Sequence, residues 1–288
     1  MGTAIPALSP EDDESLIAMC EAGRLYDLES WIREGRALTG SGRRATALEI
    51  AVRRGFHSLV ELCLRHESSQ HSKNLALTLA VDGRRADLAE LALTYGADIH
   101  AVCFFDALAS WNSKMARLFM EHGADPIEGH PFANAFSERV RTSLGTYLEC
   151  KRSRPALATA LQAQADMALR KHALDGNTKW VSLMLWIGAN PRTRGPVIGD
   201  TLGREDDEDM YVTALSAACD GGNPEVLAWL KPDPSVDPFP ELIEECAGQG
   251  HAAVLRVLLE RGAAPAASPD GGSKALTRSL VSPGDGKA

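Results

Sequence analysis

The sequence predicts an all-α fold, built as a solenoid of short helix–turn–helix repeats, from three observations. Residues 46–66 and 213–233 align, and their shared columns hold Thr46 and Thr213, Leu48 and Leu215, Ala51 and Ala218, and Gly55 and Gly222. Residues 241–265 follow the same pattern, with a turn at Gly250-His251. A Gly-Ala sequence ends four amphipathic stretches. One such helix pair cannot bury its own apolar face, so neighbouring pairs are expected to stack.

Seven copies of the repeat are predicted along the chain, at residues 15–38, 46–68, 74–100, 103–127, 166–192, 212–234 and 240–265. In four of them a Gly-Ala terminator follows the second helix. Its Gly accepts the left-handed conformation that ends a helix, and Asp125 or Asn190 before Pro begins the turn to the next repeat. The four Gly-Ala terminators are Gly96-Ala97-Asp98, Gly123-Ala124-Asp125-Pro126, Gly188-Ala189-Asn190-Pro191 and Gly262-Ala263-Ala264-Pro265.

These motifs resemble the ankyrin repeat family, and the resemblance covers most of residues 15–265. The chain departs from the family pattern in three places. The stretch Thr46-Ala47-Leu48-Glu49 lacks the usual Pro and His, Trp111 stands where a turn Gly belongs, and His172 falls on a column of small buried residues. The resemblance implies protein binding through a concave face of first helices and loops, and no catalysis by the repeats themselves.

The remaining segments set the domain boundaries. Residues 1–14 form an N-terminal segment, and residues 266–288 form a tail rich in Pro, Gly and Ser. Two stretches interrupt the repeats. Residues 127–165 are expected to be a helical insertion or one degenerate repeat with an extended inner helix, and Pro155 suits the start of a helix there. Residues 192–212 are expected to form a long loop carrying the acidic run Glu205 to Asp209.

The charge and composition of the chain argue against some classes of binding partner. The net charge is −9 and the pI about 5.4, so a nucleic-acid partner, which needs a basic stripe, is not expected. No apolar run reaches the roughly 18–20 residues of a membrane span. Because no secretory signal is evident, we expect a cytoplasmic, monomeric protein with reduced cysteines. Abundant Ala and Arg with few Lys suggests a GC-rich bacterial genome.

Motifs for chemistry are weak in this sequence. His66 and His71 are five residues apart rather than four, so they would not share a helix face as zinc ligands do. Cys219 and Cys246 occupy small-residue columns and are expected to be core thiols. His251, in the Gly-His turn, is expected to bond backbone. We therefore expect no enzyme activity, no metal and no cofactor.

Tryptophans and charged loop residues are the candidate contacts for a protein partner. Trp31 and Trp229 fall on apolar columns and are expected in the core, and Trp180 begins an apolar stripe. Trp186 replaces an outward polar residue, and Trp111 lies at a turn. The predicted partner-binding residues are Trp111, Trp186, Arg192, Arg194, Glu205, Asp206, Asp207, Glu208 and Asp209.

Three alternatives remain open from the sequence. The chain could be a regulatory or inhibitory subunit of an enzyme. It could be an enzyme whose pocket, in the irregular middle, is lined by His172, Cys150 or the acidic run. It could also bind nucleic acid through the Arg-rich stretch at residues 139–154.

Overall fold

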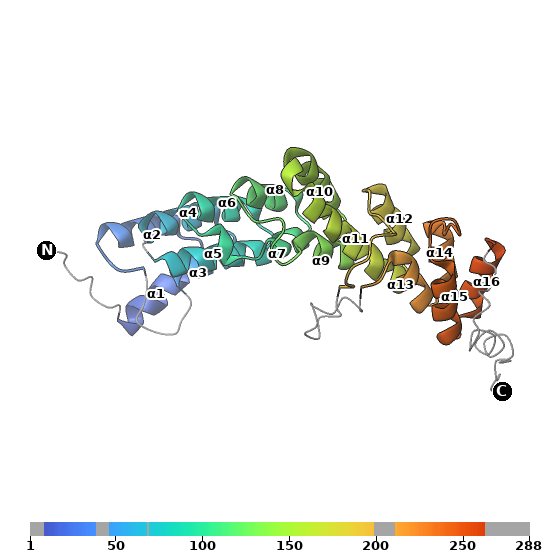
Figure 1. Cartoon of the computed structure of the whole chain (residues 1–288). Helices are drawn as coiled ribbons and strands as arrows, with labels where there is room; N and C mark the ends of the chain where they lie inside the picture. Colours follow the sequence, from blue (N-terminus) through green and yellow to red (C-terminus); the bar gives the residue numbers. More distant parts are fainter. Residues whose placement is uncertain (1–8, 39–45, 68, 199–210, 263–288) are drawn as a thin grey trace, which may run out of the picture. The chain divides into compact units, whose positions relative to one another are not determined.

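The computed structural model describes residues 9–38, 46–67, 69–198 and 211–262, which form pairs of antiparallel helices (Figure 1). The chain divides into two compact units, Met1–Pro131 and Phe132–Ala288. In the described ranges, helices account for all regular structure apart from one isolated β-bridge between Gly195 and Val212. The predicted all-α solenoid of helix–turn–helix repeats is confirmed.

Unit 1 contains four helix pairs, each joined by a tight turn. The pairs are α1 (Pro10–Glu21) with α2 (Leu25–Arg33), α3 (Ala47–Arg54) with α4 (His57–His66), α5 (Gln70–Asp82) with α6 (Ala86–Thr94), and α7 (Phe104–Ala109) with α8 (Ser113–Glu121). A short 3-10 helix, η1 (Ile99–Ala101), precedes α7.

Unit 2 contains four further pairs. They are α9 (Pro131–Ser137) with α10 (Thr142–Ser153), α11 (Ala158–Leu174) with α12 (Thr178–Trp186), α13 (Ala214–Asp220) with α14 (Pro224–Leu230), and α15 (Phe239–Gly248) with α16 (Ala252–Glu260). The 3-10 helix η2 (Pro155–Leu157) leads into α11.

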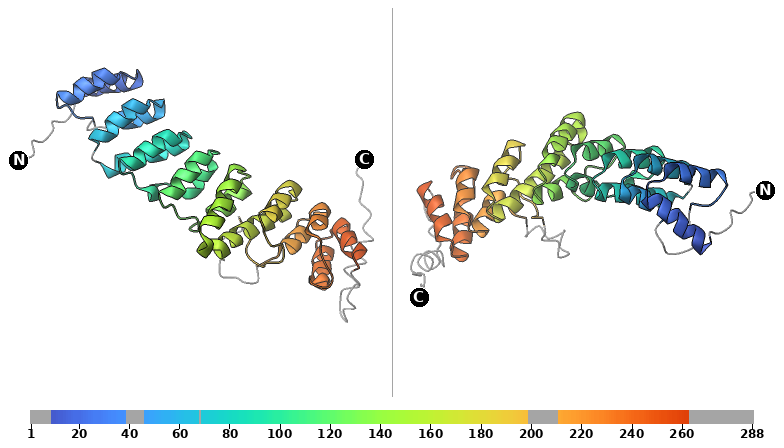
Figure 2. Two further views of the ribbon diagram at one scale, coloured as in Figure 1. Left: turned by 90° about the horizontal axis from the view of Figure 1, so that it is seen from above. Right: turned by 180° about the vertical axis from the view of Figure 1, so that it is seen from behind.

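Within each unit the helices form two layers. First helices pack on first helices of the next pair, as α1 on α3 and α11 on α13, and second helices on second helices, as α4 on α6 and α12 on α14. The helix pairs of each unit lie side by side in Figure 2. Each pair therefore buries its apolar face against its neighbours, as the sequence argument requires.

Two predicted boundaries change in the structure. The first helix begins at Pro10 rather than at residue 15, because Ser9 caps it by accepting a bond from the Asp12 backbone N–H, at 3.1 Å. Glu11, Asp12 and Asp13, which belong to the predicted N-terminal segment 1–14, thus form the first turn of α1, where carboxylates face the positive end of the helix dipole. Residues 127–165 supply the pair α9 and α10, so this stretch continues the alternation of first and second helices.

An aromatic cluster holds the α9–α10 pair in unit 2. The Tyr147 ring meets the Phe132 and Phe136 rings edge-on, with centroids 5.4 Å apart in each case, and Phe136 lies 6.5 Å from Trp180. All four side chains are buried. This cluster replaces the small-residue packing of the regular repeats, which explains why the repeat pattern is hard to find there.

The aligned threonines have a structural role. Thr46 accepts a bond from the Glu49 backbone N–H, and the Glu49 carboxylate accepts from the Thr46 backbone N–H, which is a complete capping box at the start of α3. Thr213 likewise accepts from the Ser216 backbone N–H and caps α13. Recurrence of Thr at this column therefore marks the start of the first helix.

Candidate interaction surfaces

Exposed tryptophans are the first feature that could contact a partner. Trp186, at the end of α12, is 69% exposed, and Trp111, in the α7–α8 turn, is 49% exposed, both as the sequence indicates. Trp31 and Trp180 are buried, which confirms those predictions. Trp229 was expected in the core, and this was wrong: its side chain is 53% exposed.

The reason for the Trp229 error is the narrow buried face of α14. Val226, Leu227 and Leu230 fill that face, and Trp229 projects beside it. The sequence shows an apolar run, Val226-Leu227-Ala228-Trp229-Leu230, in which a helical period alone does not separate the edge of the stripe from its centre.

One face of α12 carries Lys179, Leu183 and Trp186, at the i, i+4 and i+7 spacing of a single helix stripe. Lys179 and Trp186 are exposed and Leu183 is half-buried. The opposite face holds the buried Trp180 and Val181 against the core. The second helix of this repeat is therefore apolar on both sides, which is unusual for a helix with one solvent-facing side.

A hollow of about 390 Å³ lies beside this stripe, between the second helices of three consecutive repeats in unit 2. Its lining comes from α10 and the residue before it, from α12, and from α14. The lining residues are Arg141, Leu144, Thr178, Lys179, Ser182, Leu183 and Trp229.

The charge of this hollow differs from that of the chain. Its charged lining residues are two cations, Arg141 and Lys179, whereas the chain carries a net charge of −9. Both are exposed, and neither makes an ion pair within the described ranges. A hollow lined by apolar side chains and by two cations suits a ligand with apolar and anionic groups.

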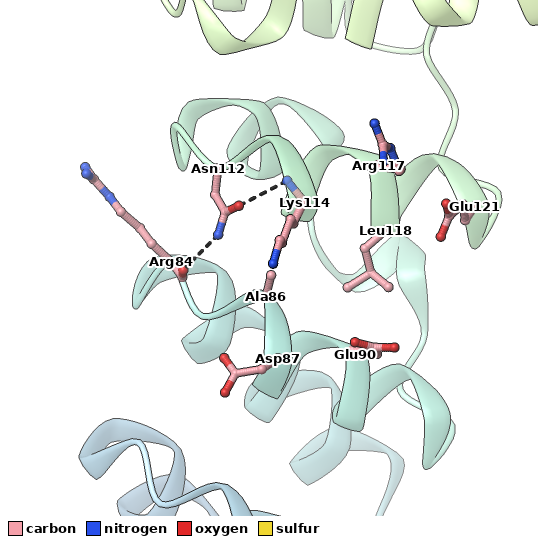
Figure 3. A pocket seen from close by; sticks show the side chains of 9 residues that line it. All are labelled: Arg84, Ala86, Asp87, Glu90, Asn112, Lys114, Arg117, Leu118 and Glu121. Carbon is pink, nitrogen blue, oxygen red and sulfur yellow. Dashed lines mark hydrogen bonds between the residues drawn. The ribbon is translucent and has the colours of Figure 1, made fainter. Parts of the chain in front are cut away.

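A second hollow, of about 470 Å³, lies between α6 and α8 in unit 1 (Figure 3). Leu118 lies between the two helices, and the Arg84 side chain points away from the other residues drawn. The Asn112 side chain joins the two repeats, because its amide donates to the Arg84 carbonyl at 3.2 Å while its oxygen caps α8 at Lys114.

Charges of both signs line the unit 1 hollow. The cations Lys114 and Arg117 line it together with the carboxylates of Asp87, Glu90 and Glu121. Asp87 is already paired with Arg85 at 2.7 Å, and the hydrogen bond from that guanidinium lowers the pKa of Asp87. This hollow therefore offers no preference for one sign of charge.

Arg192, a predicted partner contact, is bonded inside unit 2. Its Nε and Nη2 atoms donate to the two carboxylate oxygens of Asp237 at 2.7 and 3.0 Å. The Asp237 side chain is buried and also accepts from the Asp233 backbone N–H at 2.8 Å. Arg192 thus fixes the connection between α14 and α15, and a contact with a partner remains a prediction.

Arg194, another predicted contact, donates through Nε and Nη2 to the Tyr211 carbonyl at 3.1 and 2.9 Å. Beneath this segment the buried Arg170 donates to the carbonyls of Thr193 and Pro196 at 3.1 and 2.9 Å. Burial lowers the pKa of Arg170 to about 10. Residues 192–198 are therefore held in place by arginine side chains from both sides.

The remaining predicted contacts, Glu205, Asp206, Asp207, Glu208 and Asp209, lie outside the described residues. Their role stays a prediction.

His172 and Cys150, the candidates for an active site in the irregular middle, are both buried. His172 Nε2 bonds the Phe136 carbonyl at 3.0 Å, and its ring stacks on Trp180 with centroids 5.3 Å apart. Neither residue lines either hollow. The oddly placed histidine of the sequence thus packs in the aromatic cluster, where burial lowers its pKa.

The cysteines and turn residues mostly take the structural places expected of them. Cys103 is exposed, whereas the other five thiols are buried, and Cys219 lies against Cys246. His251 bonds the Asp220 carbonyl at 2.9 Å. The described residues contain no group of three or more side chains suited to hold a metal, and none of their helices is long and apolar enough to cross a membrane.

Comparisons with known proteins add little to this description. No protein-family model matches the chain, and no curated protein matches it. Among solved structures, the crystal structure of the human ASB11 ankyrin repeat domain is similar at a TM-score of 0.39 and 17% sequence identity, covering 90% of this chain and 100% of that chain.

Four residues of the unit 2 hollow, Leu144, Lys179, Leu183 and Trp229, are not among the contacts predicted from the sequence, and Arg141 enters only through the Arg-rich stretch at residues 139–154. The available signal was the α12 stripe, in which Lys179, Leu183 and Trp186 recur at helical spacing on the face opposite the core. The hollow itself could not be predicted, because it needs α10, α12 and α14 to be neighbours, and α10 lies in the stretch taken as an insertion.

Proposed function

We propose that this protein is a protein-recognition module, a solenoid that binds a partner protein through the surface of its second helices. The observation that carries the proposal is Trp186, an indole 69% exposed on a regular helix. Tryptophan is the residue type most enriched among the anchors of protein interfaces, and exposing its large apolar surface is unfavourable without a partner.

The position of Trp186 suits an anchor. It stands on a helix that Trp180, Val181 and Met184 hold to the core, so its backbone is fixed before binding. A pre-organised side chain loses little conformational entropy when it inserts into a partner. Loop residues, by contrast, would have to be ordered during binding.

Trp111 gives separate support from unit 1. Its φ of 58° lies in the left-handed region, which is costly for a bulky residue and is usually given to Gly in such a turn. Strain retained at an exposed residue is typical of functional positions. We propose Trp111 as a second contact, and we propose that Arg194 and the acidic run Glu205 to Asp209 also contact the partner.

The test places a photo-crosslinking amino acid at position 186 in the full chain, in the cells that make the protein. We expect one partner to be captured at this position. The matched control is position 26, because Tyr26 is an aromatic residue 80% exposed on α2 of unit 1. Capture at both positions alike, or at neither, would contradict a specific interface at Trp186.

An inhibitory or regulatory role is the finer alternative within the same class. If the captured partner is an enzyme, its activity should be assayed with the intact protein and with Trp186→Ala. Loss of activity only with the intact protein would make this chain an inhibitor, whereas unchanged activity would make it a scaffold.

A further inference from the structure

The hollow between α10, α12 and α14 has a composition that specifies its ligand. Leu144, Leu183 and Trp229 supply apolar surface, and Arg141 and Lys179 supply positive charge. These five side chains come from three successive repeats, so a segment bound here would lie across the second-helix layer. Trp186 extends the same surface along α12, one helical turn beyond Leu183.

We propose that this hollow binds a protein segment that carries an apolar anchor flanked by carboxylates. This inference rests on the proposed function and adds the chemistry of the partner to it. The apolar anchor covers Trp229 and the two leucines, and the carboxylates pair with Arg141 and Lys179.

The charge of the lining favours an anionic ligand. Arg141 and Lys179 face the same hollow, and no carboxylate shares the lining with them. A pair of cations beside an apolar floor raises the local potential and favours an anionic segment over a basic one. The chain as a whole carries a net charge of −9, so the positive lining of this hollow is opposite in sign to the charge of the chain.

The hollow in unit 1 serves as an internal comparison. It is of similar size, but its lining includes Asp87, Glu90 and Glu121 beside its cations. Its only large apolar lining residue is Leu118, which is buried. The unit 1 hollow, which also lies between second helices, therefore lacks the two features that specify the ligand in unit 2: several apolar lining residues, and positive charge without carboxylates.

The experiment is a selection of random displayed peptides on the full-length protein. We expect the enriched peptides to carry Leu, Phe or Trp flanked by Asp or Glu. A synthetic copy of one such peptide should lose at least tenfold in affinity for Trp229→Ala and for the double variant Arg141→Glu/Lys179→Glu. Circular dichroism checks that each variant is folded.

A charge-matched control separates local contacts from the overall field. Arg53→Glu/Arg256→Glu changes the net charge by the same amount at exposed positions outside the hollow. The peptide should bind this control like the unchanged protein. An equal loss in both double variants would overturn the proposal, because long-range charge alone would then explain the binding.

Other occupants of the hollow give different results, and each would overturn the proposal. Enrichment of basic or uncharged peptides would overturn it, and so would a selection in which no peptide is enriched. Binding of an oligo-dT that is lost in Arg141→Glu/Lys179→Glu would assign the hollow to nucleic acid. Sedimentation as a dimer that Trp229→Ala dissociates would assign it to a second copy. If position 186 still captures a partner in cells, the recognition function stands without this ligand chemistry.

Discussion

Among single residues, the buried His172 has an ionisation that is tied to folding. Its Nε2 bonds the Phe136 carbonyl, and its Nδ1 is buried without a hydrogen-bond partner in the described structure. Protonation would place a second N–H donor at Nδ1, where nothing accepts it. Burial therefore lowers the pKa of His172 below the ordinary value of 6.5, which outweighs the opposite effect of the bond to Phe136.

The sign of the pH effect follows from this shift. As the pH falls below about 6.5, the unfolded chain takes up a proton at His172 before the folded chain does, so the stability of unit 2 decreases until the folded pKa is reached. Urea denaturation followed by circular dichroism from pH 7.5 to 5 measures it. The decrease should be smaller in His172→Gln than in His100→Gln, whose imidazole is exposed. Equal decreases would contradict the assignment.

Arg84 holds a left-handed conformation, with φ of 57°, in the turn before α6, where its side chain is exposed. Arg84→Gly should be more stable than Arg84→Ala by about 1 kcal/mol, because only glycine adopts this φ without steric cost. Urea denaturation of the two variants gives the difference.

The control for Arg84 is the same pair of substitutions at Glu90, an exposed position inside α6. There the sign should reverse, with the Gly variant less stable than the Ala variant, again by about 1 kcal/mol. If the Gly variant were less stable than the Ala variant at both positions, the left-handed conformation of Arg84 would be contradicted.

The residue scale also shows where sequence patterns are sufficient and where they fail. Thr46, Gly55 and Trp186 were placed correctly, because a cap, a helix end and an outward column each follow from local spacing. Trp229 was misplaced, because burial at the edge of a stripe depends on the neighbouring repeat. His172 was noticed as an exception, but its partner Phe136 comes from a stretch whose repeat pattern is not visible in the sequence.

At the scale of elements, turns and connections join successive repeats. Asn223, before α14, donates to the carbonyls of Ala173 and Leu174 at the end of α11, at 3.0 and 2.7 Å. Arg85, before α6, similarly reaches the Gly55 carbonyl at 3.3 Å. At the ends of α11 and α3, carbonyl groups thus accept from the following repeat, which couples these neighbouring pairs.

A further prediction concerns Arg192 and Arg194, the two arginines that the sequence marks as partner contacts. Arg192 holds the connection between α14 and α15. Arg192→Ala leaves the buried Asp237 carboxylate without its guanidinium and should reduce the stability of unit 2 by about 1–3 kcal/mol. Arg194→Ala removes bonds to an accessible segment and should cost less than about 1 kcal/mol. Thermal or urea denaturation compares the two variants; a larger loss for Arg194→Ala would contradict the structural role assigned to Arg192.

Helices in copies that follow the repeat pattern could be predicted more accurately than helices in copies that depart from it. The second and seventh copies lie at the positions the sequence predicts, α3–α4 and α15–α16. Thr46 caps α3 and Gly55 makes the turn in the second copy, whereas the turn at Gly250 and the terminator at Gly262 mark the seventh. For residues 127–165 the sequence predicts only an insertion or a degenerate repeat, since in the pair α9–α10 Phe132, Phe136 and Tyr147 replace the small residues that identify a repeat. Aromatic packing of this kind depends on shapes in three dimensions and leaves no fixed spacing in the sequence.

For the whole molecule, the stacking of helix pairs within each unit followed from repetition alone, but the location of the candidate site did not. The sequence favours first helices and loops as the binding face. Both hollows instead lie between second helices, α6 and α8 in unit 1 and α10, α12 and α14 in unit 2. Such hollows arise from side chains of different repeats, which a one-dimensional pattern does not bring together.

The central claim is that the second-helix surface around Trp186 recognises a protein, and the affinity of the purified, crosslink-identified partner tests it most directly. Titration calorimetry should show that Trp186→Ala weakens binding by about 2 kcal/mol or more, roughly thirtyfold, while Tyr26→Ala leaves it unchanged. Equal affinities for the unchanged protein and Trp186→Ala, with both folded, would contradict the account.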